Sequence, residues 1–128
     1  MKTVWTNGCF DILHIGHIEL FHYAKSLGDY LVVGVDTDER VKASKGESRP
    51  FNCLQDRIAM LEAVRHVNEV VVFDSDKELE SQILQCEASF IIVGSDYKDK
   101  KVIGSDLAKV IFFDRITNYS TTKILEGL

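Results

Sequence analysis

The 128-residue sequence predicts an α/β fold, a doubly wound parallel sheet of five strands with helices on both faces. Three observations lead to this prediction. Short β-rich runs alternate with helical segments along the chain. The second run, YLVVGVD, is almost continuously apolar, as expected of a strand buried on both faces. The most polar segments each follow a strand, which is where ligands bind in such sheets.

The expected strands share β-branched or aromatic residues and end in glycine or polar residues. They cover residues 2–7, 30–36, 69–74, 89–96 and 108–114.

The expected helices lie between and after these strands. Apolar residues at three- and four-residue steps from Ile18 to Leu27 predict the first helix, which Gly28 ends. The polar segment 37–52 predicts a short helical turn and then a loop. The other helices are expected over 53–67 with Asn52 as its cap, 77–88, and 120–128 with Ser120 or Thr121 as its cap.

Composition indicates one domain over residues 1–128, because 45% apolar residues can build one core. The net charge of −5 disfavours a nucleic-acid binder, which usually carries a basic face, but allows a local basic pocket. No apolar run approaches the roughly 20 residues of a membrane span. The three cysteines form no CxxC pair, so we expect free thiols and a cytoplasmic protein.

The segment NGCFDILHIGH, after the first strand, carries the most informative pattern. His14 and His17 stand at the expected helix start, where free N–H groups and the helix dipole attract an anion. Residues three apart share a helix face, so both imidazoles can reach one phosphate. Gly8 permits a tight turn, and Gly16 removes a side chain that would collide with a ligand. The pattern favours a triphosphate site.

Other interpretations of the two histidines remain open at this point. A zinc site would need further ligands, and His22 and His66 are the only other histidines. The pair could also be ordinary residues on a helix surface. Cys9 could act as a nucleophile, although nothing nearby marks it as activated, and a small residue filling the turn is the simpler interpretation.

The segment after the second strand is cationic, with Lys42, Lys45 and Arg49 around Gly46. It could be a solvated loop or a loop that folds over a phosphate. Arg57 stands one turn into the next helix, where the helix dipole gives no reason for an arginine. It could bind a substrate phosphate or lie on the surface.

The last polar segment has three consecutive hydroxyls, Ser120, Thr121 and Thr122, at an expected helix start. Capping explains one of them, and all three together predict a phosphate nest. Arg115 can add a fixed positive charge.

Taken together, these segments resemble the cytidylyltransferase-like nucleotidyltransferases, a branch of the HxGH superfamily that also includes class I aminoacyl-tRNA synthetases. NGCFDILHIGH is similar to the pattern G-x-F-D-x-x-H-x-G-H, and RITNYSTTKI to R-T-x-G-x-S-T-T-x-I. The resemblance covers essentially the whole chain. It implies a Rossmann-like nucleotidyltransferase fold and an enzyme in which an acceptor phosphate attacks the α-phosphate of a nucleoside triphosphate, releasing pyrophosphate. No covalent enzyme intermediate is implied.

The resemblance also implies roles for individual residues. His14, His17 and Lys45 would serve the transfer step, and Lys42 and Arg57 would hold the acceptor phosphate. Mg²⁺ is implied, held mainly by the phosphates rather than by the protein. The residues implied to bind the nucleotide are Cys9, Phe10, Gly16, Asp96, Arg115, Ser120, Thr121 and Thr122.

Two positions depart from the second pattern. Asn118 replaces its glycine, and asparagine is the next most tolerant residue of a left-handed backbone. Ile116 replaces its second residue, threonine, so the role of that position does not carry over.

The implied substrates are an NTP and a sugar or polyol phosphate. KGESRPFN and GSDYK resemble the adenylyltransferase domain of bacterial heptose-phosphate enzymes, which favours ATP and heptose 1-phosphate. LGDYLVVGVDTDE and STTKI resemble glycerol-3-phosphate cytidylyltransferase, which uses CTP. Members are often homodimers, so a homodimer is implied here. Either product would be an activated building block for a cell-surface polymer.

Two further interpretations would place the chain in another functional class, a tRNA synthetase or a non-catalytic regulator. KASKG is similar to the KMSKS loop of tRNA synthetases, but it stands in the middle of the chain, and the counterpart of that loop should be STTKI. A non-catalytic nucleotide-binding regulator could share the fold, but such a binder has no need of both His14 and His17.

Overall fold

The computed structural model of the protein describes residues 1–95 and 98–114. Its centre is a parallel sheet with the strand order β3-β2-β1-β4-β5. The order reverses between β1 and β4, so the predicted doubly wound five-stranded α/β fold is confirmed. The strands are β1 (Thr3–Gly8), β2 (Tyr30–Asp36), β3 (Glu69–Phe73), β4 (Phe90–Gly94) and β5 (Lys109–Phe113).

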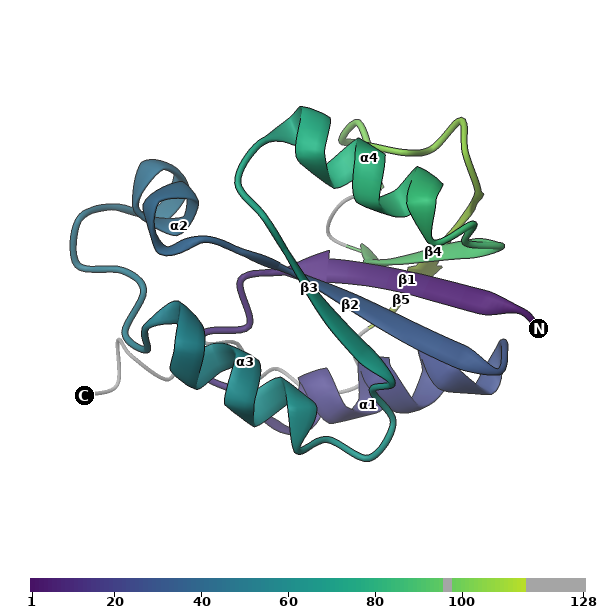
Figure 1. Ribbon diagram of the computed structural model, residues 1–128, viewed down its shortest axis with the longest axis horizontal. Helices are drawn as coiled ribbons and strands as arrows, with labels where there is room; N and C mark the ends of the chain where they lie inside the picture. The colour runs from purple at the N-terminus through teal and green to yellow at the C-terminus, as the bar shows by residue number, and fades with distance from the viewer. Residues whose placement is uncertain (96–97, 115–128) are drawn as a thin grey trace.

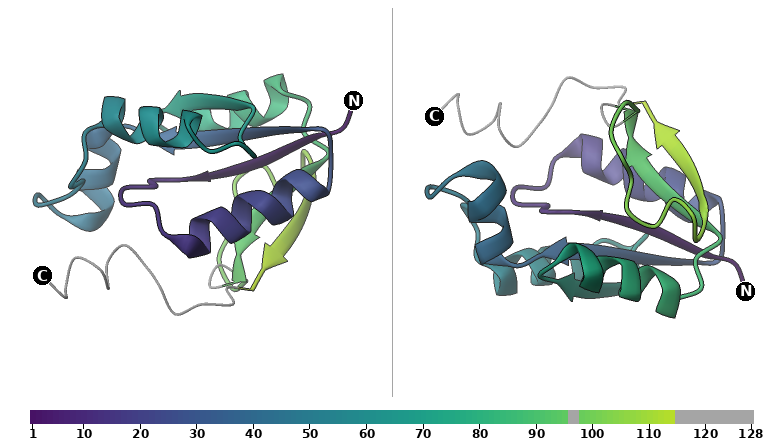
Figure 2. Two further views of the ribbon diagram at one scale, coloured as in Figure 1. Left: turned by 90° about the horizontal axis from the view of Figure 1, so that it is seen from below. Right: turned by 90° about the horizontal axis from the view of Figure 1, so that it is seen from above.

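Helices cover both faces of the sheet. α1 (Ile15–Ser26) and α3 (Leu54–Glu62) lie on one face and α4 (Asp76–Gln85) on the other, whereas α2 (Asp38–Lys45) lies beyond the carboxyl end of β2 (Figures 1 and 2). Each face has its own core. Phe21 of α1 and Leu61 of α3 are fully buried on one side, and Leu79 and Ile83 of α4 are buried on the other.

Alternate residues of the central strands supply the two cores. Val4 packs toward α1, while its neighbour Trp5 packs toward α4, and both are fully buried. Gly34 on β2 makes room for the indole ring, because a Cβ there would lie 2.5 Å from Cζ2 of Trp5. Side chains therefore pack closely on both faces of β1 and β2, and this packing fixes the position of the strand ends that carry the polar segments.

Several expected boundaries differ from the structure. The segment after β2 forms an eight-residue helix, longer than the expected turn. α3 ends at Glu62 rather than at residue 67, because Val64 and Val67 form tighter turns whose N–H groups bond three residues back. The N-cap of α3 is Cys53, which makes no side-chain cap hydrogen bond. The expected cap, Asn52, instead donates its side-chain amide to the carbonyl of Asp11. The expected helix 120–128 lies outside the described residues.

Candidate active site

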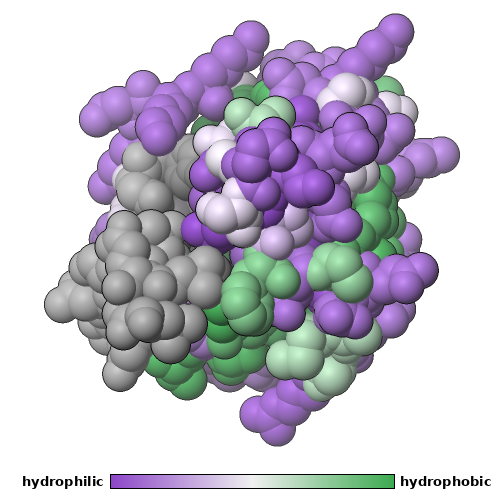
Figure 3. All heavy atoms as spheres, turned by 90° about the vertical axis from the view of Figure 1, so that its left-hand side faces the viewer, coloured by the Kyte–Doolittle hydropathy of each residue, from purple (hydrophilic) through white to green (hydrophobic). Residues whose placement is uncertain are grey.

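An open pocket of about 960 Å³ lies at the carboxyl ends of β1, β2 and β4, beside the first turn of α1. This is the switch point at which strand order reverses, as the sequence predicted. Hydrophilic residues cover much of the face at which the strands end (Figure 3). Among the predicted residues, the pocket is lined by Cys9, Phe10, His14, Gly16, His17 and Lys45.

His14 and His17 form the first turn of α1. His14 is the N-cap, and its Nδ1 accepts a hydrogen bond from the backbone N–H of Gly16 at 3.1 Å. Nδ1 of His17 accepts from the backbone N–H of His14 at 3.2 Å, which completes a capping box. The two ring centroids are 3.9 Å apart. The predicted placement of both histidines at one helix start is confirmed.

This hydrogen-bonding pattern fixes which nitrogen of each ring carries the proton. Because Nδ1 of both His14 and His17 accepts from the backbone, the neutral rings carry their proton on Nε2. Each imidazole therefore has an Nε2–H donor beside the positive dipole end of α1. The first turn of the helix is a set of hydrogen-bond donors suited to phosphoryl oxygens.

The turn before α1 positions His17 through packing. Phe10 has a φ of 48°, a left-handed conformation, and its side chain is 6% exposed. Its ring contacts His17 edge-on at a centroid distance of 5.5 Å and also packs against Phe21. A Cβ at Gly8 would lie 3.2 Å from the same ring, so glycine there lets Phe10 fold back over the strand end.

Asp11 is a structural residue to which the sequence analysis assigned no role. Its side chain is buried and accepts hydrogen bonds from the backbone N–H groups of Phe51 at 2.7 Å and Asn52 at 2.8 Å. Nε of Arg49 donates to the same carboxylate at 3.2 Å, and the Asn52 amide donates back to the Asp11 carbonyl at 2.6 Å. The loop between α2 and α3 is thereby tied to the loop between β1 and α1.

Arg57 is neither on the surface nor at the acceptor site, the two positions expected from the sequence. It is fully buried, so it is neither a surface arginine nor open to an acceptor phosphate. Nη1 donates to the carbonyls of Cys9 at 2.9 Å and Asp36 at 2.8 Å, Nε to the Asn52 carbonyl, and Nη2 to the Asp38 carboxylate. Arg57 joins the ends of β1 and β2 to the start of α3, and these contacts favour a structural role.

The cations of the last turn of α2 and of the loop after it separate into two groups. Lys45 and Arg49 line the pocket, as expected of a loop that faces a phosphate. Lys42 is exposed and is not among the pocket-lining residues of the described chain, so its expected phosphate contact is not supported. The structure adds Lys100 and Lys101, from the segment after β4, to the pocket lining. That segment was predicted to carry chemistry, but no residue within 98–107 was singled out.

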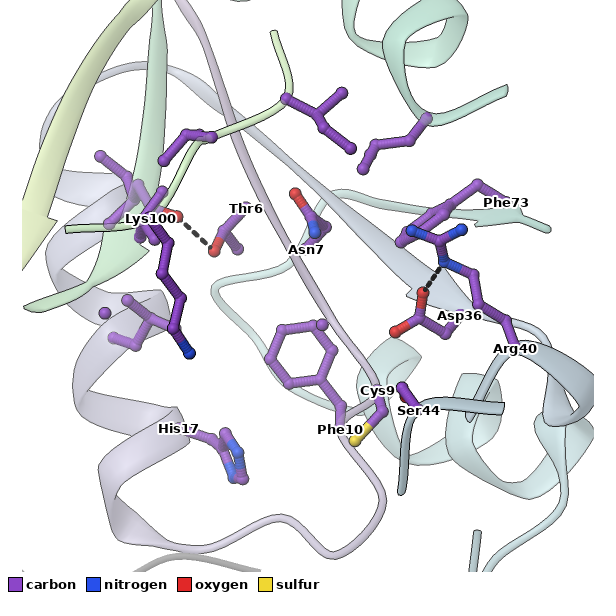
Figure 4. Close-up of a pocket in the computed structure, with 18 of the residues that line it drawn as sticks. Thr6, Asn7, Cys9, Phe10, His17, Asp36, Arg40, Ser44, Phe73 and Lys100 are labelled. Carbon is purple, nitrogen blue, oxygen red and sulfur yellow. Dashed lines mark hydrogen bonds and ion pairs between the residues drawn. The ribbon is translucent and has the colours of Figure 1, made fainter. Parts of the chain in front are cut away.

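Asp36 and Arg40 form an ion pair in the pocket that the sequence analysis missed. Nε of Arg40 donates to Oδ1 of Asp36 at 2.9 Å (Figure 4). Nη2 of Arg40 donates to the Asp76 carboxylate at 2.6 Å. The guanidinium also lies over the ring of Phe73, 5.3 Å from its centroid. Burial raises the pKa of the Asp36 carboxyl, and the opposing effect of Arg40 is smaller.

The raised pKa of Asp36 predicts a pH-dependent effect of Asp36→Asn on stability. A carboxyl whose pKa is higher in the folded state stabilises the fold at low pH, and this contribution is lost as pH rises through the folded pKa. Asparagine does not titrate. The melting temperature of the variant minus that of the wild type should therefore be more positive at about pH 7 than at about pH 4, measured by circular dichroism. An equal difference at both pH values would contradict the assignment.

Comparison with known proteins then decides the family. The profile of the family described as Cytidylyltransferase-like matches residues 5–127. The chain belongs to the cytidylyltransferase-like family.

Relatives and solved structures agree with this cytidylyltransferase-like assignment. A protein of Campylobacter jejuni named bifunctional protein HldE is 49% identical over 99% of this chain, and one of Helicobacter hepaticus with the same name is 43% identical. The chain spans only 28% and 26% of their lengths. The crystal structure of a lipopolysaccharide core biosynthesis protein from Thermoplasma volcanium aligns with a TM-score of 0.73 and 26% identity, covering 94% of this chain and 99% of the other.

The same cytidylyltransferase-like fold extends to more distant structures. A pantoate-beta-alanine ligase from Francisella tularensis aligns over 98% of this chain and 68% of its own with a TM-score of 0.64 and 18% identity, which indicates a shared fold only.

Some expected site residues of this cytidylyltransferase-like chain lie outside the described residues. They are Asp96, Arg115, Ser120, Thr121 and Thr122, together with the two departures from the family pattern, Ile116 and Asn118.

The residues that the structure describes contain neither a metal-ligand cluster nor a membrane-spanning helix. Within residues 1–95 and 98–114, no three His, Cys, Asp or Glu side chains gather as potential metal ligands. This leaves the zinc interpretation of His14 and His17 without a ligand set there. No helix among the same residues has the length and apolar character needed to cross a bilayer.

Proposed function

We propose that this domain transfers a nucleoside monophosphate, with ATP as the favoured donor, to a sugar phosphate such as heptose 1-phosphate and releases pyrophosphate. The observation that carries the proposal is the first turn of α1, where two imidazoles with Nε2–H donors and the positive end of the helix dipole meet at the pocket. These donors suit the charge that builds on phosphoryl oxygens during transfer.

In the proposed reaction, an oxygen of the acceptor phosphate attacks the α-phosphorus while the bond to the bridging oxygen of pyrophosphate breaks. Both substrates are bound at once, so catalysis rests on positioning and charge stabilisation. His14 and His17 donate from Nε2 to phosphoryl oxygens, and Lys45 at the end of α2 and Arg49 in the loop after it add positive charge. Asp96, Arg115, Ser120, Thr121 and Thr122 are proposed to hold the rest of the nucleotide.

Mg²⁺ is proposed to enter with the nucleotide and to offset phosphate charge. The nucleotide phosphates, rather than protein side chains, would supply most of its ligands. A single domain, a homodimer and a cytoplasmic location complete the proposal, and light scattering during size-exclusion chromatography tests the dimer.

The choice of acceptor rests on sequence. The segments KGESRPFN and GSDYK resemble the heptose-phosphate adenylyltransferase domain. The relatives named HldE and the solved lipopolysaccharide core biosynthesis protein support the same choice through their likeness to the whole chain. The residues LGDYLVVGVDTDE favour glycerol-3-phosphate cytidylyltransferase as the second candidate.

An activity assay tests the proposed function. The protein is incubated with Mg²⁺, ATP or CTP, and heptose 1-phosphate or glycerol 3-phosphate, and released pyrophosphate is measured. We expect release with ATP and heptose 1-phosphate. Release only with CTP and glycerol 3-phosphate would replace the favoured substrates with the second pair. No release from any pair, with nucleotide binding retained, would indicate the non-catalytic regulator instead.

A further inference from the structure

We propose that Asp36 binds hydroxyl groups of the acceptor and so selects a polyhydroxylated phosphate, a sugar or polyol phosphate, as the second substrate. This inference rests on the proposed transfer reaction and assigns a recognition residue to its acceptor half.

The first argument is the geometry of the carboxylate. Asp36 is the last residue of β2, and its side chain is 20% exposed at the pocket. Oδ1 is held by Nε of Arg40, and Arg40 is itself fixed by Asp76 and by the ring of Phe73. Oδ2 makes no hydrogen bond within the described residues, and Figure 4 shows it turned toward the open space beside Cys9. One oxygen is anchored and the other is available to a ligand.

The second argument is charge. Among the pocket-lining residues that the structure describes, Asp36 is the only acidic one. The charged residues that share this lining are Arg40, Lys45, Arg49, Lys100 and Lys101. A phosphate would avoid the carboxylate and bind the cations. The part of a ligand that lies against Oδ2 must therefore be a hydrogen-bond donor without negative charge, and a sugar hydroxyl is such a donor.

The third argument is the position of Asp36 relative to β1. The pocket is centred on the end of β1, with β2 on one side and β4 on the other. Of the residues proposed to bind the nucleotide outside the first turn of α1, Cys9 and Phe10 follow β1 and the others follow β4 and β5. Asp36 lies on the β2 side, together with α2 and the loop that follows it. If the triphosphate occupies the part of the pocket next to α1, the part next to β2 remains for the acceptor. The hydroxyls that reach Asp36 then belong to the acceptor.

The test compares Asp36→Ala and Asp36→Asn with the wild type. Asparagine keeps a side-chain oxygen that can accept from a hydroxyl, so it should retain acceptor affinity within about threefold, whereas alanine should weaken it about tenfold or more. Asp76→Ala is the matched control, because it also removes a carboxylate partner of Arg40 but lies outside the pocket lining. Its acceptor affinity should equal that of the wild type.

Two readouts separate this inference from the proposed reaction. Calorimetric titration gives the Kd of heptose 1-phosphate and of methyl phosphate, which lacks hydroxyls, in the presence of a non-hydrolysable ATP analogue. Asp36→Ala should weaken binding of the sugar phosphate and leave that of methyl phosphate unchanged. Steady-state kinetics should show a higher acceptor KM and an unchanged ATP KM.

The possible outcomes are distinct. Loss of sugar phosphate binding in Asp36→Ala, without turnover in the wild type, would overturn the reaction and keep the recognition role. Normal turnover with an unchanged acceptor Kd in Asp36→Ala would overturn the recognition role and keep the reaction. Equal weakening of methyl phosphate would also overturn it, because the carboxylate would then act only by positioning Arg40.

Discussion

Replacement of His17 by alanine should lower kcat about a hundredfold or more, because the variant loses an Nε2–H donor aimed at charge that builds only in the transition state. The KM values for both substrates should change much less than kcat, since a donor used mainly in the transition state contributes little to ground-state binding. The measurement is pyrophosphate release at saturating substrates, with the pair that gives turnover in the wild type.

Two further variants separate chemistry from folding. His17 also caps the helix, because its Nδ1 accepts from the backbone N–H of His14. Glutamine at position 17 can make the same cap, so His17→Gln should keep the wild-type melting temperature but not its kcat. His22→Ala is the control on the same helix, since His22 is exposed and contacts His66 instead of the pocket. Wild-type kcat in His17→Ala would remove His17 from the mechanism.

Replacement of Arg57 by methionine should destabilise the protein by about 3–5 kcal/mol, the cost typical of breaking a buried, paired charge. Methionine fills similar volume but leaves the carbonyls of Cys9 and Asp36 without their shared donor. Urea unfolding followed by circular dichroism measures the free energy. Arg65→Met is the control, because Arg65 is exposed just beyond the same helix, and its change should stay within about 0.5 kcal/mol.

This variant also decides between the structural role of Arg57 and the acceptor-phosphate role that the family pattern implies. A structural residue changes stability first, and every kinetic constant only as a result. Wild-type stability in Arg57→Met, together with a raised KM for the acceptor alone, would return Arg57 to the acceptor site.

The alternation of strands and helices was enough to predict the fold, because buried parallel strands and amphipathic helices leave strong periodic patterns. The position of the histidine pair was also predictable, since helix capping depends on residues adjacent in sequence. Arg57 shows where such reasoning fails. It stands on the same helical face as Leu54 and Leu61, so a charge within an apolar stripe was a signal of a buried, paired arginine.

Contacts between residues distant in sequence could not be predicted in the same way. The partners of Asp11 are 38 to 41 residues away, and no local pattern connects them. Arg40 and Asp76 are 36 residues apart, and Arg40 looked like one charge among many in a polar segment. Pairing of this kind depends on how the strand ends meet, which is a property of the assembled sheet.

The hydrogen bonds that Asp11 accepts from the α2–α3 loop matter for any attempt to change the acceptor by exchanging that loop. The carboxylate between the β1–α1 turn and the α2–α3 connection means that the two loops form one exchangeable unit. A graft of residues 46–53 from a relative with another acceptor would need the matching residues 10–12 as well. Grafted alone, a loop without the arginine would lose the Nε donor of Arg49, and a loop of another shape would move the backbone N–H groups of residues 51 and 52 away from a buried carboxylate.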